Sequence, residues 1–209
     1  RVAEDYLQYD LDVTTEDPGG EALKNTGTGR YGVRVVIGGD SLDWYGASAG
    51  GVAYLNSFDD PEDRPCWVFP KGLADDEKNI AEACSHEAGH TLGLSHDGQT
   101  SGVEYYTGQG NWAPIMGVGY DRPIVQWSKG EYNLANNTED DLTRMLSFGA
   151  INRPDDYGDN TASARPLAGV RPFLWGIIGS RTDADYFSFE AGAGRTTITA
   201  SPAPRGPNL

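Results

Sequence analysis

The sequence is poor in long apolar runs, basic residues, cysteine and histidine, and each shortage narrows what the chain can be. No apolar stretch is long enough for a transmembrane helix, so membrane insertion is not expected. Lys and Arg number 16 against 31 Asp and Glu, which gives a formal net charge of −15. Such a surface repels nucleic acid and anionic membranes, so neither is an expected partner.

Two cysteines are too few for a disulfide-rich scaffold, and they form either one bridge or two buried thiols. Cys84 lies two residues before His86 on a predicted helix, and Cys66 lies in the apolar stretch before that helix. The even count suits an oxidising compartment, and a bridge from strand to helix is geometrically easy. We therefore expect a Cys66–Cys84 disulfide in a secreted protein, whose signal and any pro-segment lie outside this chain.

The few histidines that are present are concentrated in one segment. The chain has three, and all of them fall in the stretch HEAGHTLGLSH. His86 and His90 are four residues apart, so on a helix they project from one face. Gly93 can end that helix with a sharp turn, after which His96 arrives from the loop. Glu87 adjoins the first histidine, close enough to reach a water on a shared metal ion.

Three imidazoles with one open position are the ligand set of catalytic zinc, so we expect one Zn²⁺ held by His86, His90 and His96. The alternative is that HExxH occurs on a helix by chance and binds no metal. The full spacing HExxHxxGxxH is much rarer than HExxH alone, which argues against this alternative. The acidic turn 59–63 is the one candidate for calcium. A solvated loop is favoured there, so Ca²⁺ has no support.

The motif resembles that of the metzincin zinc endopeptidases, in which HExxHxxGxxH is followed by a methionine turn. Asp97, directly after the third histidine, is similar to the reprolysin branch, and Met116 in WAPIMG stands where the family has its turn methionine. For residues 1–150 the resemblance implies an α+β catalytic domain that is incomplete at its N-terminus. It would hold a twisted, mostly parallel sheet, an active-site helix, the Met-turn and a C-terminal helix.

The resemblance also implies roles for particular residues. Glu87 would act as the general base, and Asp97 would anchor the loop below the zinc by hydrogen bonds. Tyr120 is a candidate for approaching the zinc or the oxyanion, although a packing role is favoured. Residues 118–125 would shape the pocket for the side chain after the cut. The substrate would add a strand to the sheet edge beginning at Gly51, Val52, Ala53 and Tyr54.

Hydrophobic alternation and turn residues predict strands at 7–15, 31–37, 51–58 and 66–69. The active-site helix should begin at Asp75 or Asp76, and Thr138 should cap a helix that runs to about Phe148. After a linker at 152–156, residues 151–209 resemble the start of a bacterial pre-peptidase C-terminal domain, with the signature Asp183-Ala-Asp185-Tyr-Phe187. This resemblance implies a partial β-sandwich.

The sequence thus predicts a secreted zinc endopeptidase, which would use water activated by Glu87 to hydrolyse peptide bonds. Its expected partners are protein or peptide substrates, and we expect a monomer. Two alternatives stay open. One is a non-catalytic binding or adhesion module with structural zinc, and the other is a zinc amidase acting on cell-wall substrates.

Overall fold

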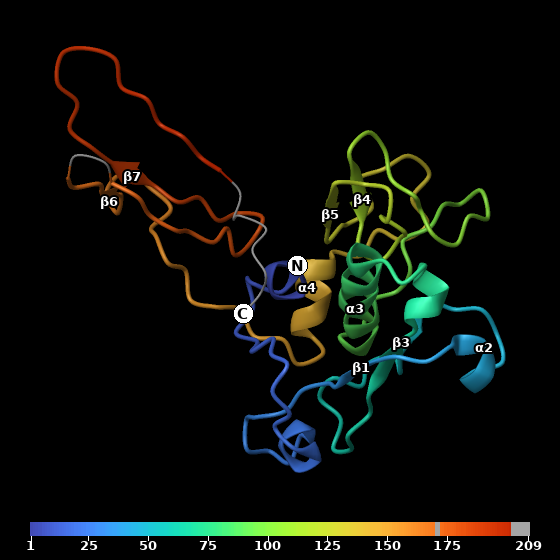
Figure 1. The fold of residues 1–209 in the computed structure, drawn as a ribbon. Coiled ribbons are helices and arrows are strands. Elements are labelled where there is room, and N and C mark those ends of the chain that lie inside the picture. Colours follow the sequence, from blue (N-terminus) through green and yellow to red (C-terminus); the bar gives the residue numbers. More distant parts are fainter. Residues whose placement is uncertain (170–171, 202–209) are drawn as a thin grey trace.

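The computed structural model describes residues 1–169 and 172–201, and its architecture is α+β, with small sheets and few helices. One long helix, α3, runs through the middle of the main body (Figure 1). No helix among the described residues is both long enough and apolar enough to span a bilayer. In chain order the elements are α1 Val2–Asp5, η1 Gly20–Leu23, β1 Val35–Ile37, α2 Ser41–Trp44, β2 Gly51–Val52, β3 Cys66–Val68, η2 Pro70–Leu73, α3 Glu77–Thr91, β4 Trp112–Pro114, β5 Ile124–Gln126, α4 Asp141–Leu146, β6 Arg165–Pro166 and β7 Phe187–Ser188.

The sheet beside α3 has the strand order β1-β3-β2. β1 runs parallel to β3, with Val35 opposite Cys66, whereas β2 runs antiparallel to β3, with Gly51 opposite Val68. Val68 is fully buried and packs in one apolar cluster with Ala83 of α3. The sheet therefore rests on α3 through β3 and leaves β2 as an edge strand.

Local signals account for both ends of α3. The Asp76 side chain accepts a hydrogen bond from the Asn79 amide, which satisfies one of the free amides of the first turn. Past the last turn, Gly93 has φ of +89°, and a Cβ at this position would collide with the ring of Phe148. Both the backbone angle and the space therefore require glycine where the chain leaves the helix.

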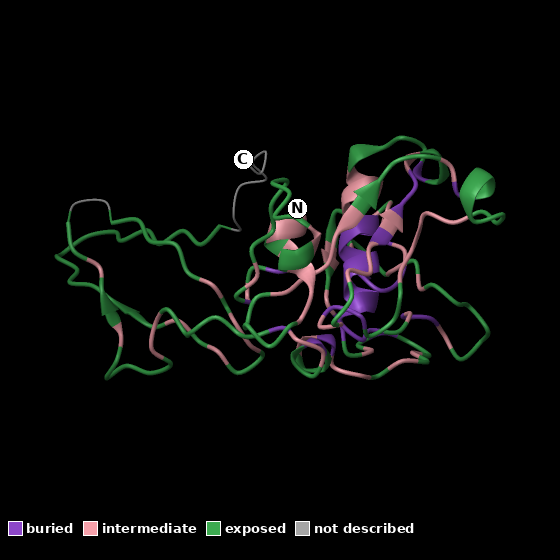
Figure 2. Cartoon of the chain, turned by 90° about the horizontal axis from the view of Figure 1, so that it is seen from below, coloured by how far each residue is buried: buried purple, intermediate pink, exposed green. Residues whose placement is uncertain are grey.

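The main core lies on the other side of α3. Leu92, Leu94, Met116 and Met145 are almost completely buried in it, together with Tyr9 from the start of the chain. Figure 2 shows that burial concentrates along α3 and the segments around it. The helix that carries the histidines is therefore fixed by apolar packing on two sides.

The predicted disulfide is not formed, because Cys66 and Cys84 are both free thiols. Both side chains are buried, and Cys84 belongs to the apolar cluster between the sheet and α3. Burial raises the pKa of Cys84 to about 11 and raises that of Cys66 as well. Protonated in this way, the two residues act as small apolar side chains.

Several predicted strands are shorter than expected or missing. Residues 7–15 form no strand, and Tyr9 makes only an isolated bridge to Asn152. The predicted strand 51–58 stops after Val52, so Ala53 and Tyr54 lie outside it. Beyond them, the amides of Asn56 and Phe58 donate to the carbonyl oxygens of His90 and Thr91 at 3.1 and 3.0 Å. The amides of this segment therefore pair with the free carbonyl groups in the last turn of α3 instead of extending the sheet.

The helix after the predicted methionine turn also begins later than expected. Thr138 is not its cap. Asp140 is, accepting a hydrogen bond from the Leu142 amide at 3.2 Å. A carboxylate is at least as good an N-cap as a threonine hydroxyl, and it also interacts favourably with the helix dipole. The helix α4 ends at Leu146, before the predicted Phe148.

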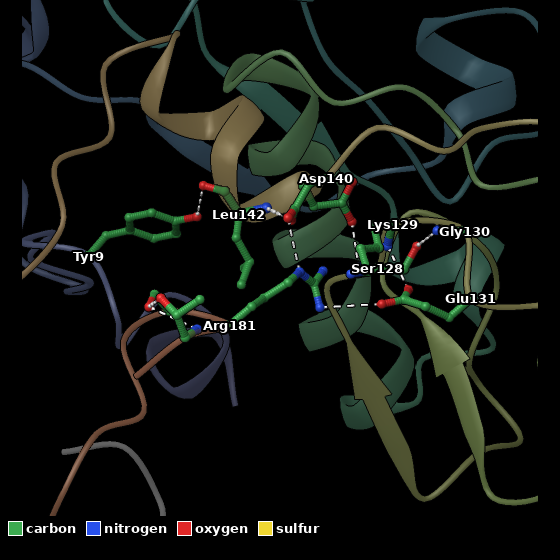
Figure 3. A network of polar contacts seen from close by, with 11 residues as sticks. Tyr9, Ser128, Lys129, Gly130, Glu131, Asp140, Leu142 and Arg181 are labelled. Carbon is green, nitrogen blue, oxygen red and sulfur yellow. Dashed lines mark hydrogen bonds and ion pairs between the residues drawn. The ribbon is translucent and has the colours of Figure 1, made fainter. Parts of the chain in front are cut away.

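Described residues from 151 onward extend away from the main body as long loops (Figures 1 and 2). Their strands are the two-residue parallel pair β6–β7, with Phe187 of the predicted signature in β7, and no larger sheet forms among the described residues of this part, outside which residues 202–209 lie. Phe173 and Ile198 are mostly exposed, because little apolar surface is gathered here. One link to the body is Arg181, which donates to Asp140 at 3.0 Å and to Glu131 at 3.3 Å (Figure 3).

Asp141, in the first turn of α4, should make stability depend on pH. Its carboxylate is fully buried and accepts from the Ser128 amide at 2.8 Å. Burial raises its pKa from 3.8 to about 8, with the charge of Asp97 contributing. Between these values the folded chain keeps a proton that the unfolded chain has lost. This group's contribution to stability therefore falls as pH rises through that window and levels off above it.

We expect Asp141→Asn to be more stable than wild type at pH 8, with the gain shrinking towards pH 5, because asparagine still accepts from Ser128 without a buried charge. One proton changes the slope by about 1.4 kcal/mol per pH unit. Urea unfolding between pH 5 and 8 measures this difference, and exposed Asp12→Asn serves as the control. Parallel curves for Asp141→Asn and wild type would contradict the assignment.

Candidate metal centre

The site is built on the buried half of α3. His86, Glu87 and His90 all lie in the last turns of this helix, with side chains at most 9% exposed. His96 comes from the loop after Gly93, which folds back against the helix through a hydrogen bond from the Leu94 amide to the Gly89 carbonyl at 3.1 Å. Helix periodicity places His86 and His90 on one face of α3, and the turn at Gly93 brings His96 beside them.

The structure brings the three histidines together. One ring nitrogen from each of His86, His90 and His96 lies within 4.8 Å of the other two. The Nε2 atoms of His90 and His96 are 3.0 Å apart. Neutral imidazole nitrogens gathered at this spacing could bind one divalent ion, and imidazole is a ligand that suits zinc.

The second nitrogen of each ring faces an oxygen acceptor. Nδ1 of His86 lies 2.9 Å from the Ile115 carbonyl, and Nδ1 of His90 lies 2.7 Å from the Leu94 carbonyl. Nδ1 of His96 lies 3.1 Å from the Glu104 carboxylate. An Nδ1–H that donates to such an oxygen leaves the Nε2 lone pair free, which is the tautomer that a metal requires.

Burial keeps these rings neutral. It lowers the pKa of His86 to about 3 and that of His90 to about 4, because an imidazolium loses its hydration there. The pKa of His96 is lowered as well, although Glu104 opposes the effect of burial. Neutral histidines bind a metal without first releasing a proton.

Glu87 lies between the histidines and the edge strand. Its side chain is 6% exposed, and burial raises its pKa to about 8. A Cβ on Gly51 of β2 would lie 2.5 Å from Cγ and 2.6 Å from Oε1 of Glu87. The carboxylate therefore packs directly against the backbone of β2. A bound dication would favour its ionised form again.

Met116 is fully buried in a tight turn, in which the Gly117 amide donates to the Pro114 carbonyl at 3.1 Å. A Cβ on Gly89 would lie 2.9 Å from the Met116 sulfur, so this thioether packs on α3 next to His90. The neighbouring Ile115 supplies the carbonyl that faces His86. The turn thus contacts the histidine-bearing helix through both sulfur and backbone.

Asp97 connects that turn to the loop carrying His96. Its amide donates to the Met116 carbonyl at 2.9 Å, and its buried carboxylate accepts from Ser128 at 2.7 Å and from Tyr132 at 3.3 Å. Burial raises its pKa to about 6, against the effect of those hydrogen bonds. Asp97 therefore joins the Met116 turn to Ser128 and Tyr132 by hydrogen bonds, next to the loop that carries His96.

The phenol that contacts the histidines is Tyr105. Its ring centroid lies 4.3 Å from that of His96 and 6.2 Å from that of His86. Tyr120, the sequence candidate, makes no ring contact with them among the described residues and instead lines a cavity next to His86. Tyr105 and Glu104 could not be placed here from the sequence, because the loop 97–110 has no periodicity.

The edge strand next to Glu87 is short. Gly51 and Val52 pair with β3 on one side only, so their other side carries no strand of the described chain. Tyr54 lies beyond the strand, and its ring contacts Trp67 at a centroid distance of 6.0 Å. An extended peptide could pair with this edge and pass in front of Glu87.

Comparison of the chain with models of protein families, with curated proteins and with solved structures returned no match. The functional argument therefore depends on the residues and geometry of this chain.

Proposed function

We propose that the protein is a zinc endopeptidase of the metzincin type, acting on protein or peptide substrates outside the cell as a monomer. The observation that carries the proposal is the cluster of three histidines whose ligand nitrogens lie within 4.8 Å of one another. Each of their Nδ1 atoms faces a separate oxygen acceptor. Glu87 provides a buried carboxylate next to this cluster.

Zinc held by His86, His90 and His96 would polarise the scissile carbonyl and acidify the attacking water. Glu87 accepts the proton of that water and delivers it to the leaving amine. The free edge of β2 holds the substrate backbone extended, so that the bond to be cut lies beside Glu87. Tyr105, 36% exposed over His96, covers the outer side of the site.

The residues around the histidines fit a structural zinc site in a binding module less well than a catalytic one. Structural sites use four protein ligands, whereas this cluster offers three histidines and leaves a position open. A buried carboxylate also costs free energy, since desolvation disfavours its charge. A role as general base explains why a carboxylate is buried at position 87, whereas a structural zinc site would not require one.

The test is proteolysis of casein or gelatin by the purified chain, combined with measurement of bound metal. We expect about one zinc per chain and cleavage that is lost with 1,10-phenanthroline and restored by added zinc. Cleavage that continues in the metal-free protein would contradict the proposal. Stoichiometric zinc without protein turnover would favour the binding module, and release from cell-wall amides alone would favour the amidase.

A further inference from the structure

Exposed aromatic rings gather on the face of the sheet turned away from α3, where the proposed reaction does not use them. Val68 of β3 packs against α3, so its neighbour Trp67 projects from the opposite face. The ring of Trp44 in α2 lies over Trp67, with centroids 4.8 Å apart, and Tyr54 lies beside it at 6.0 Å. Trp44 is nevertheless 57% exposed and Tyr54 is 50% exposed. Together with Tyr45, which stacks on Trp44, these rings form the outer aromatic cluster.

The position of α2 is fixed by short contacts. Figure 1 shows this helix at the outer edge of the main body. The buried Ser41 hydroxyl accepts from the Ala49 amide at 3.0 Å, and the Asp40 side chain caps the helix. The ring of Trp44 also contacts Phe69 at a centroid distance of 5.8 Å. A partner therefore meets rings that are already in place, which lowers the entropic cost of binding them.

The segment that carries most of this cluster is acidic. Residues 40–63 hold six acidic residues and no Lys or Arg. The six are Asp40, Asp43, Asp59, Asp60, Glu62 and Asp63. Asp43, directly before Trp44, is exposed, and its carboxylate has no ion pair or hydrogen bond within the part of the chain that the structure describes. With a formal net charge of −15 for the whole chain, this surface attracts cations and repels anions.

One ring of the cluster already binds a cation of the chain itself. The Arg64 guanidinium lies over the ring of Tyr54, 5.5 Å from its centroid, and forms an ion pair with Asp60 at 2.6 Å. An aromatic face beside a carboxylate is thus a cation site in this protein. Trp44 has the larger ring and Asp43 beside it, and no guanidinium or ammonium of the described residues lies over that ring.

We propose that the outer aromatic cluster docks a segment of the substrate that carries lysine or arginine, with the cation over Trp44 and the charge of Asp43 nearby. The inference rests on the proposed peptidase function and names cationic proteins as its substrate class. Trp67 pairs with Val52 of β2, so the cluster adjoins the edge along which the substrate would lie. A chain on that edge reaches the cluster with residues that lie outside the metal centre.

The first experiment measures binding without turnover. The probe is a short peptide that alternates D-lysine and glycine, because a peptidase for L-residues does not cut it, and its matched control alternates D-glutamate and glycine. In calorimetry with the zinc-loaded chain, we expect the lysine peptide to bind, more weakly as salt is added, and the glutamate peptide not to bind. Trp44→Leu keeps an apolar contact with Trp67 and should weaken binding about fivefold, as loss of one exposed cation–π contact predicts. Asp43→Asn should weaken it about threefold.

Two matched controls test whether these losses are local. Trp175→Leu removes a tryptophan that is 58% exposed on the loops after residue 151, and Asp12→Asn removes another exposed carboxylate. Both should keep the wild-type affinity, and thermal melts establish that all four variants are folded. Unchanged affinity in Trp44→Leu and Asp43→Asn would overturn the inference. Binding of a soluble β-glucan in place of the lysine peptide, or a dimer that Trp44→Leu dissociates, would also overturn it and assign the cluster to a carbohydrate or to a second copy.

Kinetics separates this inference from the proposed reaction. Two L-peptides share one cleavable sequence and differ in a distant block of lysine or glutamine. We expect the lysine block to lower KM about fivefold with kcat unchanged, because the cluster touches no reacting atom, and Trp44→Leu to abolish the difference. Equal KM values would overturn the inference and leave the peptidase intact. If neither peptide is cut but the D-lysine peptide binds through Trp44, the reaction is wrong and the docking surface stands, and without cleavage or binding both proposals fail.

Discussion

Replacing Glu87 by glutamine should reduce kcat/KM for peptide hydrolysis about a thousandfold, within the range that general-base catalysis contributes. Glutamine keeps the shape of the side chain packed against Gly51, but it cannot accept the proton of the attacking water. The histidines should remain in place, because their Nδ1 partners are Ile115, Leu94 and Glu104 and do not include Glu87. Steady-state kinetics with a fluorogenic peptide measures the loss.

Zinc content decides how that loss is interpreted. The Glu87→Gln protein should bind as much zinc as wild type and melt at a similar or higher temperature, since a buried carboxylate is replaced by a neutral group. Glu77→Gln, which removes an exposed carboxylate from the same helix, should keep full activity. More than a tenth of wild-type activity in Glu87→Gln would exclude this residue as the base.

The features that could be predicted from sequence depend on local spacing. Asp76 caps α3 as expected, and His86 and His90 share a helix face because they are four residues apart. Gly93 ends the helix region with a positive φ, after which the loop brings His96 beside His90. Each of these steps involves residues less than a few turns apart, so pattern and stereochemistry were enough.

The features that could not be predicted depend on distant partners. Tyr105 and Glu104 reach His96 because the neighbouring Tyr106 pairs with Asp97 and with Val118, through backbone bonds of 2.7 and 3.0 Å. Nothing in the order of residues 97–110 encodes those bonds.

The strands were predicted too generously, again because their formation depends on distant partners. Residues 7–15 alternate as a half-buried strand should, yet no strand of the described chain pairs with them. A strand exists only if a neighbour supplies its hydrogen bonds, and alternation does not say whether one will. The predicted strand 51–58 lost its far end because two of its amides are used at the end of α3 instead. In both cases the outcome depends on which backbone partners are within reach, and alternation does not encode them.

A methyl group added at Gly51 should also damage catalysis strongly, although less than loss of the base does. The Cβ of Gly51→Ala would lie 2.5 Å from Cγ of Glu87 and 2.7 Å from the backbone oxygen of Trp67. The Trp67 oxygen belongs to β3 and cannot retreat without disturbing the sheet, so Glu87 or the edge strand must move. A shift of about 1 Å in a catalytic group can cost about a hundredfold in rate, and we expect a loss of that size in kcat/KM.

Zinc content should again be unchanged, because a Cβ on Gly51 would meet no histidine among its nearest atoms. The matched control is Gly32→Ala, where the added methyl would meet one Leu23 carbon at an ordinary 3.6 Å, and its activity should stay within about twofold of wild type. Full activity in Gly51→Ala would mean that Glu87 need not lie against β2. Substrate could not then be aligned by this edge, and the path of the peptide past the histidines would have to be sought on the side of Tyr105.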